Sequence, residues 1–449
     1  MLSGCSTYHA QAISPAALMN GFEARALDNP ALRRYVAAHC GGAGACAPGI
    51  WNFNTLMLAA FYFSPELDVA RAKHGISQAV IQSAGQRPNP ALRLPFGYTT
   101  NAKPGESPYT FGLGLDIPIE TAGKRGYRTV QAQQLSNAAR FNIGNVAWQI
   151  RSRLRGHLLN LCAASRRAQL LEQQIATQQQ IVAMLDKRLA VGAASAPEDN
   201  QAHIALARNR VDLAHAQQQT QNERAQIAAT IGLPVAALAK IKINFDTFER
   251  VYPAIPVKEA RRQAVFNRAD VLSALSEYEA SQAALQLEIA RQYPDFHIGP
   301  GYTFDAGAHK FLLPLSGITL PLFNQNQGQI AEARARRKEM AARVNAVQAQ
   351  AINDTERSVQ NYRTALASLR LAESLLAAQQ RQLQDLQKTY KADETDRLTL
   401  ATAQHAWYTQ ALIHQDAQVQ VQQHIGKLED AMQRPLSATD FPAIPNTGD

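Results

Sequence analysis

The sequence predicts an α+β fold with an internal duplication, in which short strands alternate with very long helices. Three observations predict it. Apolar residues occupy every odd position over Tyr109–Ile119, which is typical of a strand with two different faces. Beyond Gly123 and Gly126 the apolar period becomes helical, and no proline interrupts it before Pro197. The same succession of strand and long helix recurs over Phe311–Arg334.

The composition fits long polar helices better than a compact catalytic core. Of the 449 residues, 18% are charged and 7% are aromatic, and Gln and Ala are very common. The net charge of +9 comes from Lys and Arg that are interspersed with Asp and Glu, without a basic run. We therefore expect no nucleic-acid partner.

No apolar run approaches the ~18 residues of a membrane-spanning helix, and the longest is Leu56–Phe63. If the chain crosses a membrane, we expect it to do so with strands.

The chain opens with Leu2, Ser3 and Gly4 before Cys5, which looks like the lipobox of a bacterial lipoprotein. The basic and apolar regions of a signal peptide do not precede this motif, so a chance match is the alternative. We expect Cys5 to carry the lipid and residues 1–11 to form a tether.

Residues 12–86 are predicted to form the N-terminal helical segment of the first repeat, with a loop at 40–50. Cys40 and Cys46 flank a Gly-Gly-Ala-Gly-Ala stretch in this loop. They form either a disulfide in an oxidising compartment or a pair of free thiols, and the sequence leaves both open. Cys162 lies at a helical apolar spacing and is expected in the core.

Four strands are predicted, two in each repeat, at 87–119 and 293–323. In the first repeat, alternation over 87–99 predicts a partner for 109–119. In the second, alternation over 296–304 is followed by a loop at 305–310 and a strand from Phe311. Because the apolar parity changes over 318–322, we expect a bulge near Ser316 and Gly317.

Each predicted strand is roughly 9 to 11 residues long, which is the length that a tilted strand needs to cross a bilayer. Four strands cannot close a membrane barrel, because about eight are the minimum and open edges are not tolerated in lipid. The chain must then oligomerise, and three copies would supply twelve strands. A soluble sheet with one wet face is the alternative.

Two long helical hairpins are predicted at 120–231 and 324–431. The first should reverse at Gly192, Ser195 and Pro197, and the second at Asp393–Asp396, where no glycine marks the turn. A linker at 232–256 joins the repeats, a helix at 257–292 starts the second repeat, and 432–449 form a tail. The apolar spacing within the hairpins is that of coiled-coil seams.

The order of these motifs resembles the TolC-like outer-membrane efflux proteins. The resemblance rests on a strand, Pro-Ile-Glu-Thr-Ala-Gly-Lys-Arg, a long helix, a Val-Gly tip and a return helix, followed by a second copy with Leu-Pro-Leu-Phe-Asn-Gln-Asn-Gln-Gly. The segments Asn89–Leu92, Ser64–Ala72 and Gly123–Arg125 look most like the branch associated with heavy-metal cation efflux.

The resemblance implies a homotrimer in the outer membrane of a Gram-negative bacterium. Its twelve strands would form one β-barrel in outer-membrane lipid, and twelve helices would continue it as a periplasmic coiled-coil barrel. Such proteins are passive ducts of tripartite efflux systems, without enzymatic activity or a cofactor. Their partners are a periplasmic adaptor, or membrane fusion protein, and an inner-membrane pump, here expected to be proton-driven. Val191, Gly192 and Ser195 match the adaptor-contacting tip.

The cargo stays open at this point. Heavy-metal cations are favoured by the branch resemblance, with organic drugs or secreted proteins as alternatives. A periplasmic adaptor or coiled-coil scaffold is the alternative from a different class, but two hairpins and four bilayer-length strands argue against it.

The family often constricts the tunnel entrance with aspartates beyond the second tip, whereas the comparable positions here are Thr399 and Thr402. A ring in the usual place is therefore not expected. The candidates for an acidic entrance are the carboxylates at the two tips, Asp393, Glu394, Asp396, Glu198 and Asp199. The alternative is that they stabilise helix starts, by ~0.3 to 1 kcal/mol each.

Catalytic and metal-binding motifs are not found. The 11 histidines form neither His-x-His nor His-x-x-x-His pairs on a helix face, and the 6 methionines are scattered. The sequence also has no phosphate-binding Gly-rich loop and no nucleophile elbow. We therefore expect no catalytic residues and no bound metal.

Overall fold

The computed structural model describes residues 7–39, 50–239, 241–252, 256–313, 315–316, 318 and 320–436. Cys5, Cys40 and Cys46, on which the lipid and disulfide predictions rest, lie outside these ranges. The chain divides into two compact units, one formed by 1–67, 146–265 and 351–449 and the other by 68–145 and 266–350. We call them unit 1 and unit 2. Among the described residues, none of the helices has the length and hydropathy needed to span a membrane.

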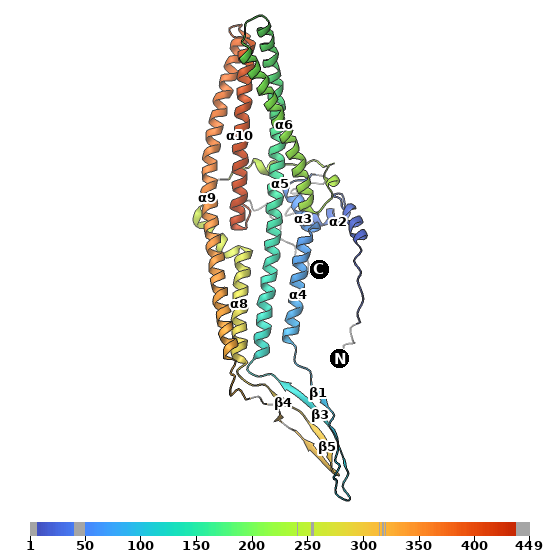
Figure 1. The fold of residues 1–449 in the computed structure, drawn as a ribbon. Coiled ribbons are helices and arrows are strands. Elements are labelled where there is room, and N and C mark those ends of the chain that lie inside the picture. Colours follow the sequence, from blue (N-terminus) through green and yellow to red (C-terminus); the bar gives the residue numbers. More distant parts are fainter. Residues whose placement is uncertain are drawn as a thin grey trace. The chain divides into compact units, whose positions relative to one another are not determined.

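Two helical hairpins dominate unit 1 (Figure 1). The first runs from α5 (Lys124–Ala190) to α6 (Ala196–Ile231), and the second from α9 (Gln327–Lys391) to α10 (Arg397–Met432). α5 and α9 begin in unit 2 and continue in unit 1. Both predicted hairpins are confirmed, with reversals where the sequence places them.

Shorter helices complete unit 1. They are α1 (Pro15–Glu23), α2 (Pro30–His39), α3 (Phe53–Phe63), the single turns η1 (Val235–Leu238) and η2 (Asp246–Glu249), and α7 (Val257–Asn267). α3 contains the longest apolar run of the chain and is buried along nearly its whole length. A capping box between Asn52 and Thr55 starts it. The run, which is too short to span a membrane, is therefore a core helix.

Two buried clusters hold the hairpins of unit 1 together. Near the tips, α5 and α6 share Ile181, Val182, Leu185, Ala202 and Leu206, with Ala401 of α10. Farther along, α7, α9 and α10 pack around Tyr362, whose hydroxyl donates to the Tyr252 carbonyl at 2.5 Å. Cys162 is also buried, as predicted, and burial raises the pKa of its thiol.

Unit 2 contains α4 (Pro65–Gly85), α8 (Ala269–Ala290), the first turns of α5 and α9, and one antiparallel sheet. Its strands are β1 (Ala91–Arg93), β2 (Phe96–Tyr98), β3 (Tyr109–Ile119), β4 (Phe296–Ile298), β5 (Gly301–Asp305), β6 (Ala308–Leu312) and β7 (Leu315–Ser316). These strands occupy four positions across the sheet, which we call lanes and which follow one another in chain order. The first lane holds β1 and β2, the second holds β3, the third holds β4 and β5, and the fourth holds β6 and β7. The four predicted strands thus correspond to four lanes.

Three lanes are interrupted without a change of register. Pairing of β3 continues in the same register from β1 to β2, and again from β5 to β4. Pro95 and Pro300 lie at two of the breaks and have no amide to donate, but their carbonyls still accept from Gly112 and Leu115. Gly299 is required beside them, since a Cβ there would lie 1.7 Å from the Leu115 carbonyl oxygen.

Two details of the strand prediction are wrong. The expected loop at 305–310 is a tight turn, because Ala306 and Gly307 both have positive φ and the strand resumes at Ala308. The expected strand over 318–322 is not formed by its described residues. In the register of β7 with β4, these residues would lie opposite the turn that precedes Phe296, where no strand is present to pair.

Candidate functional site

The first tip joins α5 to α6 through a glycine in the left-handed conformation. Gly192 has a φ of 73°, and its amide donates to the Leu189 carbonyl at 3.0 Å, which closes the last turn of α5. Ser195 then caps α6 by accepting from the Glu198 amide at 3.4 Å. Val191 projects at this tip with 78% of its surface exposed.

The second tip has the same construction without a glycine. Asp393 takes the place of Gly192 with a φ of 57°, a conformation that Asp tolerates better than most residues. Asp396 takes the place of Ser195 and accepts from the Thr399 amide at 2.8 Å. The internal duplication therefore extends to individual tip residues.

Asp396 also joins the two tips, because its carboxylate forms an ion pair with Arg188 of α5. Hydrogen bonds from the Thr399 side chain and amide, together with the Arg188 guanidinium, lower the pKa of Asp396 to about 2. The carboxylate is thus held ionised as a helix cap, which is the helix-start role weighed above for the acidic residues.

We expect Asp396→Ala to loosen the first turn of α10 by about 1 kcal/mol, because a missing cap leaves backbone amides without an acceptor. Asp396→Asn should cost less, since an amide oxygen still caps and the exposed ion pair contributes at most ~1 kcal/mol. Hydrogen-exchange protection of residues 398–400 measures both effects. Glu394→Gln is the matched control, and an equal loss there would contradict the capping role.

The same carboxylate gives a pH dependence. A lowered folded-state pKa means that its stabilisation is complete above the ordinary value of ~3.9 and is lost as pH falls through about 2. The difference in protection between wild type and Asp396→Asn should therefore persist at pH 4 and disappear near pH 2. A difference that vanishes already at pH 4 would contradict the assignment.

The five candidate carboxylates do not share one environment. Glu198, Asp393 and Glu394 are exposed at the tips, and Asp396 is tied to Arg188. Asp199 is instead buried at the start of α6, on the side that faces α5. Thr399 and Thr402, at the positions where the family resemblance placed aspartates, are both exposed.

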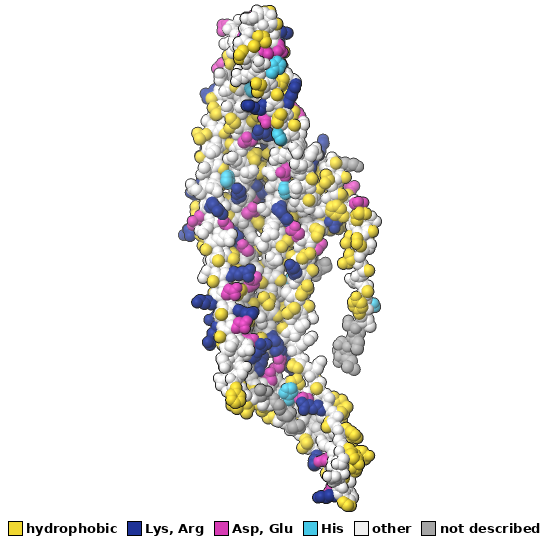
Figure 2. Space-filling view, viewed as in Figure 1, with side chains coloured by type: hydrophobic (Ala, Val, Ile, Leu, Met, Phe, Trp, Pro, Cys, Tyr) yellow, Lys and Arg dark blue, Asp and Glu magenta, His cyan; other side chains and the backbone are white. Residues whose placement is uncertain are grey.

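The sheet of unit 2 has two chemically different faces. On one face, the directly paired residues are Phe96 with Phe111, Leu113 with Tyr302, and Tyr302 with Phe311. These side chains are exposed or half-buried, and Figure 2 shows hydrophobic side chains gathered over the strands. Aromatic rings contact one another at the strand ends beside the hairpin turns, as in the pair Tyr98 and Tyr109.

The opposite face carries small and charged side chains. Asp116 of β3 forms an ion pair with Arg93 of β1 and a hydrogen bond with His297 of β4 at 2.7 Å. Toward the hairpin turns, Asp305 accepts from Lys310 at 3.1 Å. Both clusters join neighbouring lanes. The sequence analysis missed them, although the even positions of β3 already showed small and polar residues.

Comparison with known proteins decides the family. The model of the outer membrane efflux protein family matches residues 60–233 and again residues 260–432. The chain is an outer membrane efflux protein. The two matched segments correspond to the two repeats and together cover most of the chain.

Two relatives and one solved structure are similar to this efflux protein. The cobalt-zinc-cadmium resistance protein CzcC of Cupriavidus metallidurans is 25% identical over 268 residues, which cover 60% of this chain and 62% of the relative. The pyoverdine export outer membrane protein OpmQ of Pseudomonas aeruginosa is 24% identical over 451 residues, with 94% and 92% covered. The outer membrane protein VceC of Vibrio cholerae has the same fold, with a TM-score of 0.69 at 20% identity and coverages of 86% and 97%.

The Gly-Lys-Arg motif of the efflux protein has a structural role in unit 2. Lys124 is buried and donates to the Tyr293 carbonyl at 2.6 Å and to the Asp295 carboxylate at 2.8 Å. Thr121 also donates to Asp295 through its amide. The motif therefore fastens the start of α5 to the turn between α8 and β4, which joins the two repeats.

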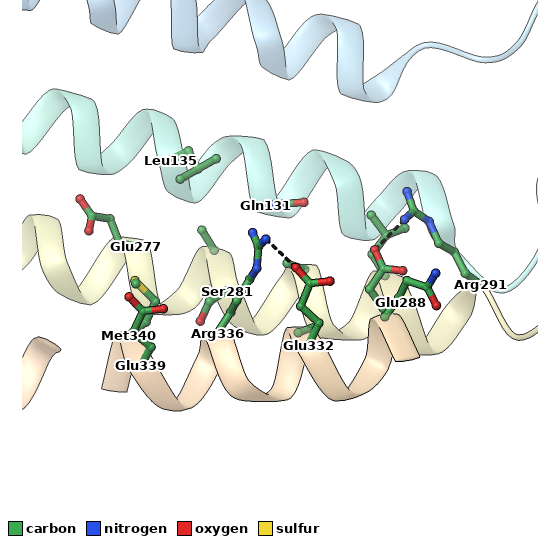
Figure 3. Close-up of a pocket in the computed structure, with 15 residues that line it drawn as sticks. Gln131, Leu135, Glu277, Ser281, Glu288, Arg291, Glu332, Arg336, Glu339 and Met340 are labelled. Carbon is green, nitrogen blue, oxygen red and sulfur yellow. Dashed lines mark hydrogen bonds and ion pairs between the residues drawn. The ribbon is translucent and has the colours of Figure 1, made fainter. Parts of the chain in front are cut away.

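A groove of about 830 Å³ lies among α5, α8 and α9 of unit 2 (Figure 3). Its charged side chains are largely paired: Glu332 with Arg336 and Glu288 with Arg291, each at 2.6 Å. The first pair lies within α9, and the second joins α8 to its C-cap residue. This is the surface of solvated helices and provides no convergent set of groups for one ligand.

A buried charge network joins α5 and α10 in unit 1. Arg151 contacts Glu429 at 3.0 Å, and Arg155 approaches the same carboxylate at 3.4 Å. Burial lowers the pKa of Arg155 and raises the pKa of the adjacent Asp430. Gly426 leaves room for Arg155, since a Cβ there would lie 2.6 Å from a guanidinium nitrogen. The helical spacing of the two arginines was the only sequence signal of this network.

Proposed function

We propose that the chain forms, as a homotrimer, the passive outer-membrane channel of a tripartite efflux system. The observation that carries this proposal is the sheet of unit 2. Its apolar face suits lipid and its polar face suits a water-filled lumen, as in transmembrane barrels. Family membership and the likeness to VceC support the same assignment.

The strand count supports closure between copies. Among the described residues, the lane of β1 and β2 pairs only with β3, and the lane of β6 and β7 pairs only with β4 and β5. Neighbouring lanes alternate in direction, so the first lane of one copy meets the last lane of the next in antiparallel orientation. Four lanes per copy, repeated three times, then give twelve strands without a free edge.

The first tip is our candidate for the contact with partner proteins. The Val191, Gly192 and Ser195 tip is proposed to contact a periplasmic adaptor, which in turn contacts an inner-membrane pump of the proton-driven type. Exposed Val191 offers the apolar contact that such a tip needs. We also retain lipidation of Cys5 as a proposal. No step in this function requires catalysis or a cofactor.

Heavy-metal cations are the proposed cargo, on the basis of the resemblance to the cobalt-zinc-cadmium resistance protein. The resemblance to the pyoverdine export protein favours organic compounds as the second candidate. Growth of a deletion strain and of its complemented counterpart, across divalent cations and organic toxicants, separates the two. If the deletion strain is sensitive to cations and the gene restores resistance, metal export is supported. Sensitivity to organic compounds alone would overturn metal export and retain the channel.

The adaptor contact makes its own prediction. Val191→Asp should weaken adaptor binding by about 2 kcal/mol, or roughly 30-fold, because a charge would replace an apolar contact. Cross-linking to the adaptor and toxicant resistance should fall together, while the amount of protein in the membrane stays constant. Val235→Asp, at an exposed position on η1, is the control. Unchanged cross-linking in Val191→Asp would contradict the contact.

A further inference from the structure

Three potential metal ligands meet beside the first tip of unit 1. Asp186 lies on α5, and Asp199 and His203 lie one turn apart on α6. The His203 Nε2 atom lies 3.1 Å from an Asp186 oxygen and 3.7 Å from an Asp199 oxygen. One potential ligand atom from each of the three residues lies within 4.8 Å of the other two. Two helices thus bring three potential ligand atoms close together.

Asp199 points to a ligand independently of this clustering. Its side chain is only 10% exposed, and its Oδ1 atom, the partner of the oxygen that lies 3.7 Å from His203, has no hydrogen-bond partner among the described residues. A buried carboxylate oxygen without a donor costs about 1–3 kcal/mol, and more when the group is charged. A cation between α5 and α6 that both oxygens of Asp199 bind would supply the missing partner.

The distances fit a small divalent cation. Ligand bonds of ~2.1 Å in tetrahedral geometry separate donor atoms by roughly 3.4 Å, which lies between the two distances to His203. An imidazole with two carboxylates suits Zn²⁺ and its first-row neighbours, whereas sites built from oxygen alone suit Mg²⁺ or Ca²⁺. Three protein ligands leave a fourth position for water or another molecule.

The surrounding packing holds the donors in place. Leu185 and Ala202, which adjoin Asp186 and His203 in sequence, belong to the buried cluster between α5 and α6. The buried Gln178 side chain also donates to the Ala202 carbonyl at 3.0 Å. The ligands therefore project from a fixed helix pair, as an ordered metal site requires.

The second repeat shows that the hairpin does not need this triad. Counted from the matching tip residues Gly192 and Asp393, the positions equivalent to Asp186, Asp199 and His203 are Gln387, Leu400 and Gln404. The second hairpin forms the same helices and the same reversal with these residues. The hairpin fold therefore does not depend on the three ligands of the first repeat.

We propose that Asp186, Asp199 and His203 form a binding site for a divalent cation of the Zn²⁺ or Co²⁺ type. The bound ion would join α5 to α6 one turn from the proposed adaptor contact and would stiffen that tip. It is a resident ion, so the site stands whether the channel exports metals or organic compounds.

Co²⁺ titration of the purified full-length protein in detergent tests the site, since tetrahedral coordination of Co²⁺ by nitrogen and oxygen gives intense visible absorption. We expect one Co²⁺ per chain with that spectrum, displaced by Zn²⁺. Asp199→Asn and His203→Gln should each weaken Co²⁺ binding at least ~10- to 100-fold, because even second-shell losses reach that size.

The chain offers matched controls. His215→Gln makes the same substitution on α6 outside the cluster and should bind Co²⁺ as the wild type does. The triple variant Asp186→Gln, Asp199→Leu, His203→Gln copies the second repeat, so it should fold and lose the spectrum. No tetrahedral Co²⁺ spectrum in the wild type, or one that survives in the triple variant, would overturn the proposal and leave only a hydrogen bond between Asp186 and His203. Efflux phenotypes do not enter this test.

Discussion

Replacing Glu429 with glutamine is expected to destabilise unit 1 by about 3–5 kcal/mol, because it leaves two buried guanidiniums without the carboxylate between them. Arg151 and Arg155 would then lie close together, and the nearby Asp430 is a carboxyl group whose raised pKa makes it a poor counter-charge. The measurement is the thermal unfolding midpoint of the protein in detergent, together with the amount that resists protease in membranes.

A double variant distinguishes destabilisation by an unbalanced buried charge from destabilisation by altered packing. Arg151→Met together with Glu429→Gln removes one charge of each sign, so it should recover about 1–3 kcal/mol relative to the sum of the single variants. The exposed pair Arg153 and Glu66 provides the matched control on the same helix, where the equivalent substitutions should cost at most ~1 kcal/mol. Equal effects at the buried and exposed pairs would contradict the role given to the network.

A charge on the apolar face of the sheet has the second large expected effect. Leu113→Arg should cost ~2 to 4 kcal/mol if the residue lies near the midplane of the bilayer, because the guanidinium would face lipid. The amount of assembled, heat-resistant trimer in outer-membrane extracts reports the loss.

The sheet offers an unusually close control in Leu312. The register places Leu312 opposite Gly301 on the polar face, whereas Leu113 lies opposite Tyr302 on the apolar face. The two leucines are 53% and 52% exposed. Leu312→Arg should therefore be tolerated at a cost of about 1 kcal/mol or less, as expected for a lumen position. Equal tolerance of both variants would contradict the assignment of the faces.

The period of the apolar residues predicted the elements whose ends are set by nearby residues. β3 begins and ends where the alternation of apolar residues does, and the hairpin tips lie where Gly192 and Asp393 interrupt the helical period. The end of a strand could not be predicted where it depends on a pairing strand that is far away in sequence. The alternation over 318–322 has no lane to pair with, because the preceding lane begins only at Phe296.

The candidate sites show the same limit. The tip residues follow from local turn and capping chemistry, so their positions could be read from the sequence. The Asp186, Asp199 and His203 cluster could not, because it combines two helices, and only the spacing of Asp199 and His203 on one helix face gave a hint. The Glu429 network likewise depends on the packing of α5 against α10, two helices that are far apart in sequence.

The mass of the complex extracted from purified outer membranes tests the central claim most directly. A channel closed by four lanes per copy predicts recovery in the outer-membrane fraction at three times the mass of the chain, in addition to bound detergent and lipid. A monomer or dimer, or recovery in the inner-membrane fraction, would contradict closure by three copies and with it the proposed channel.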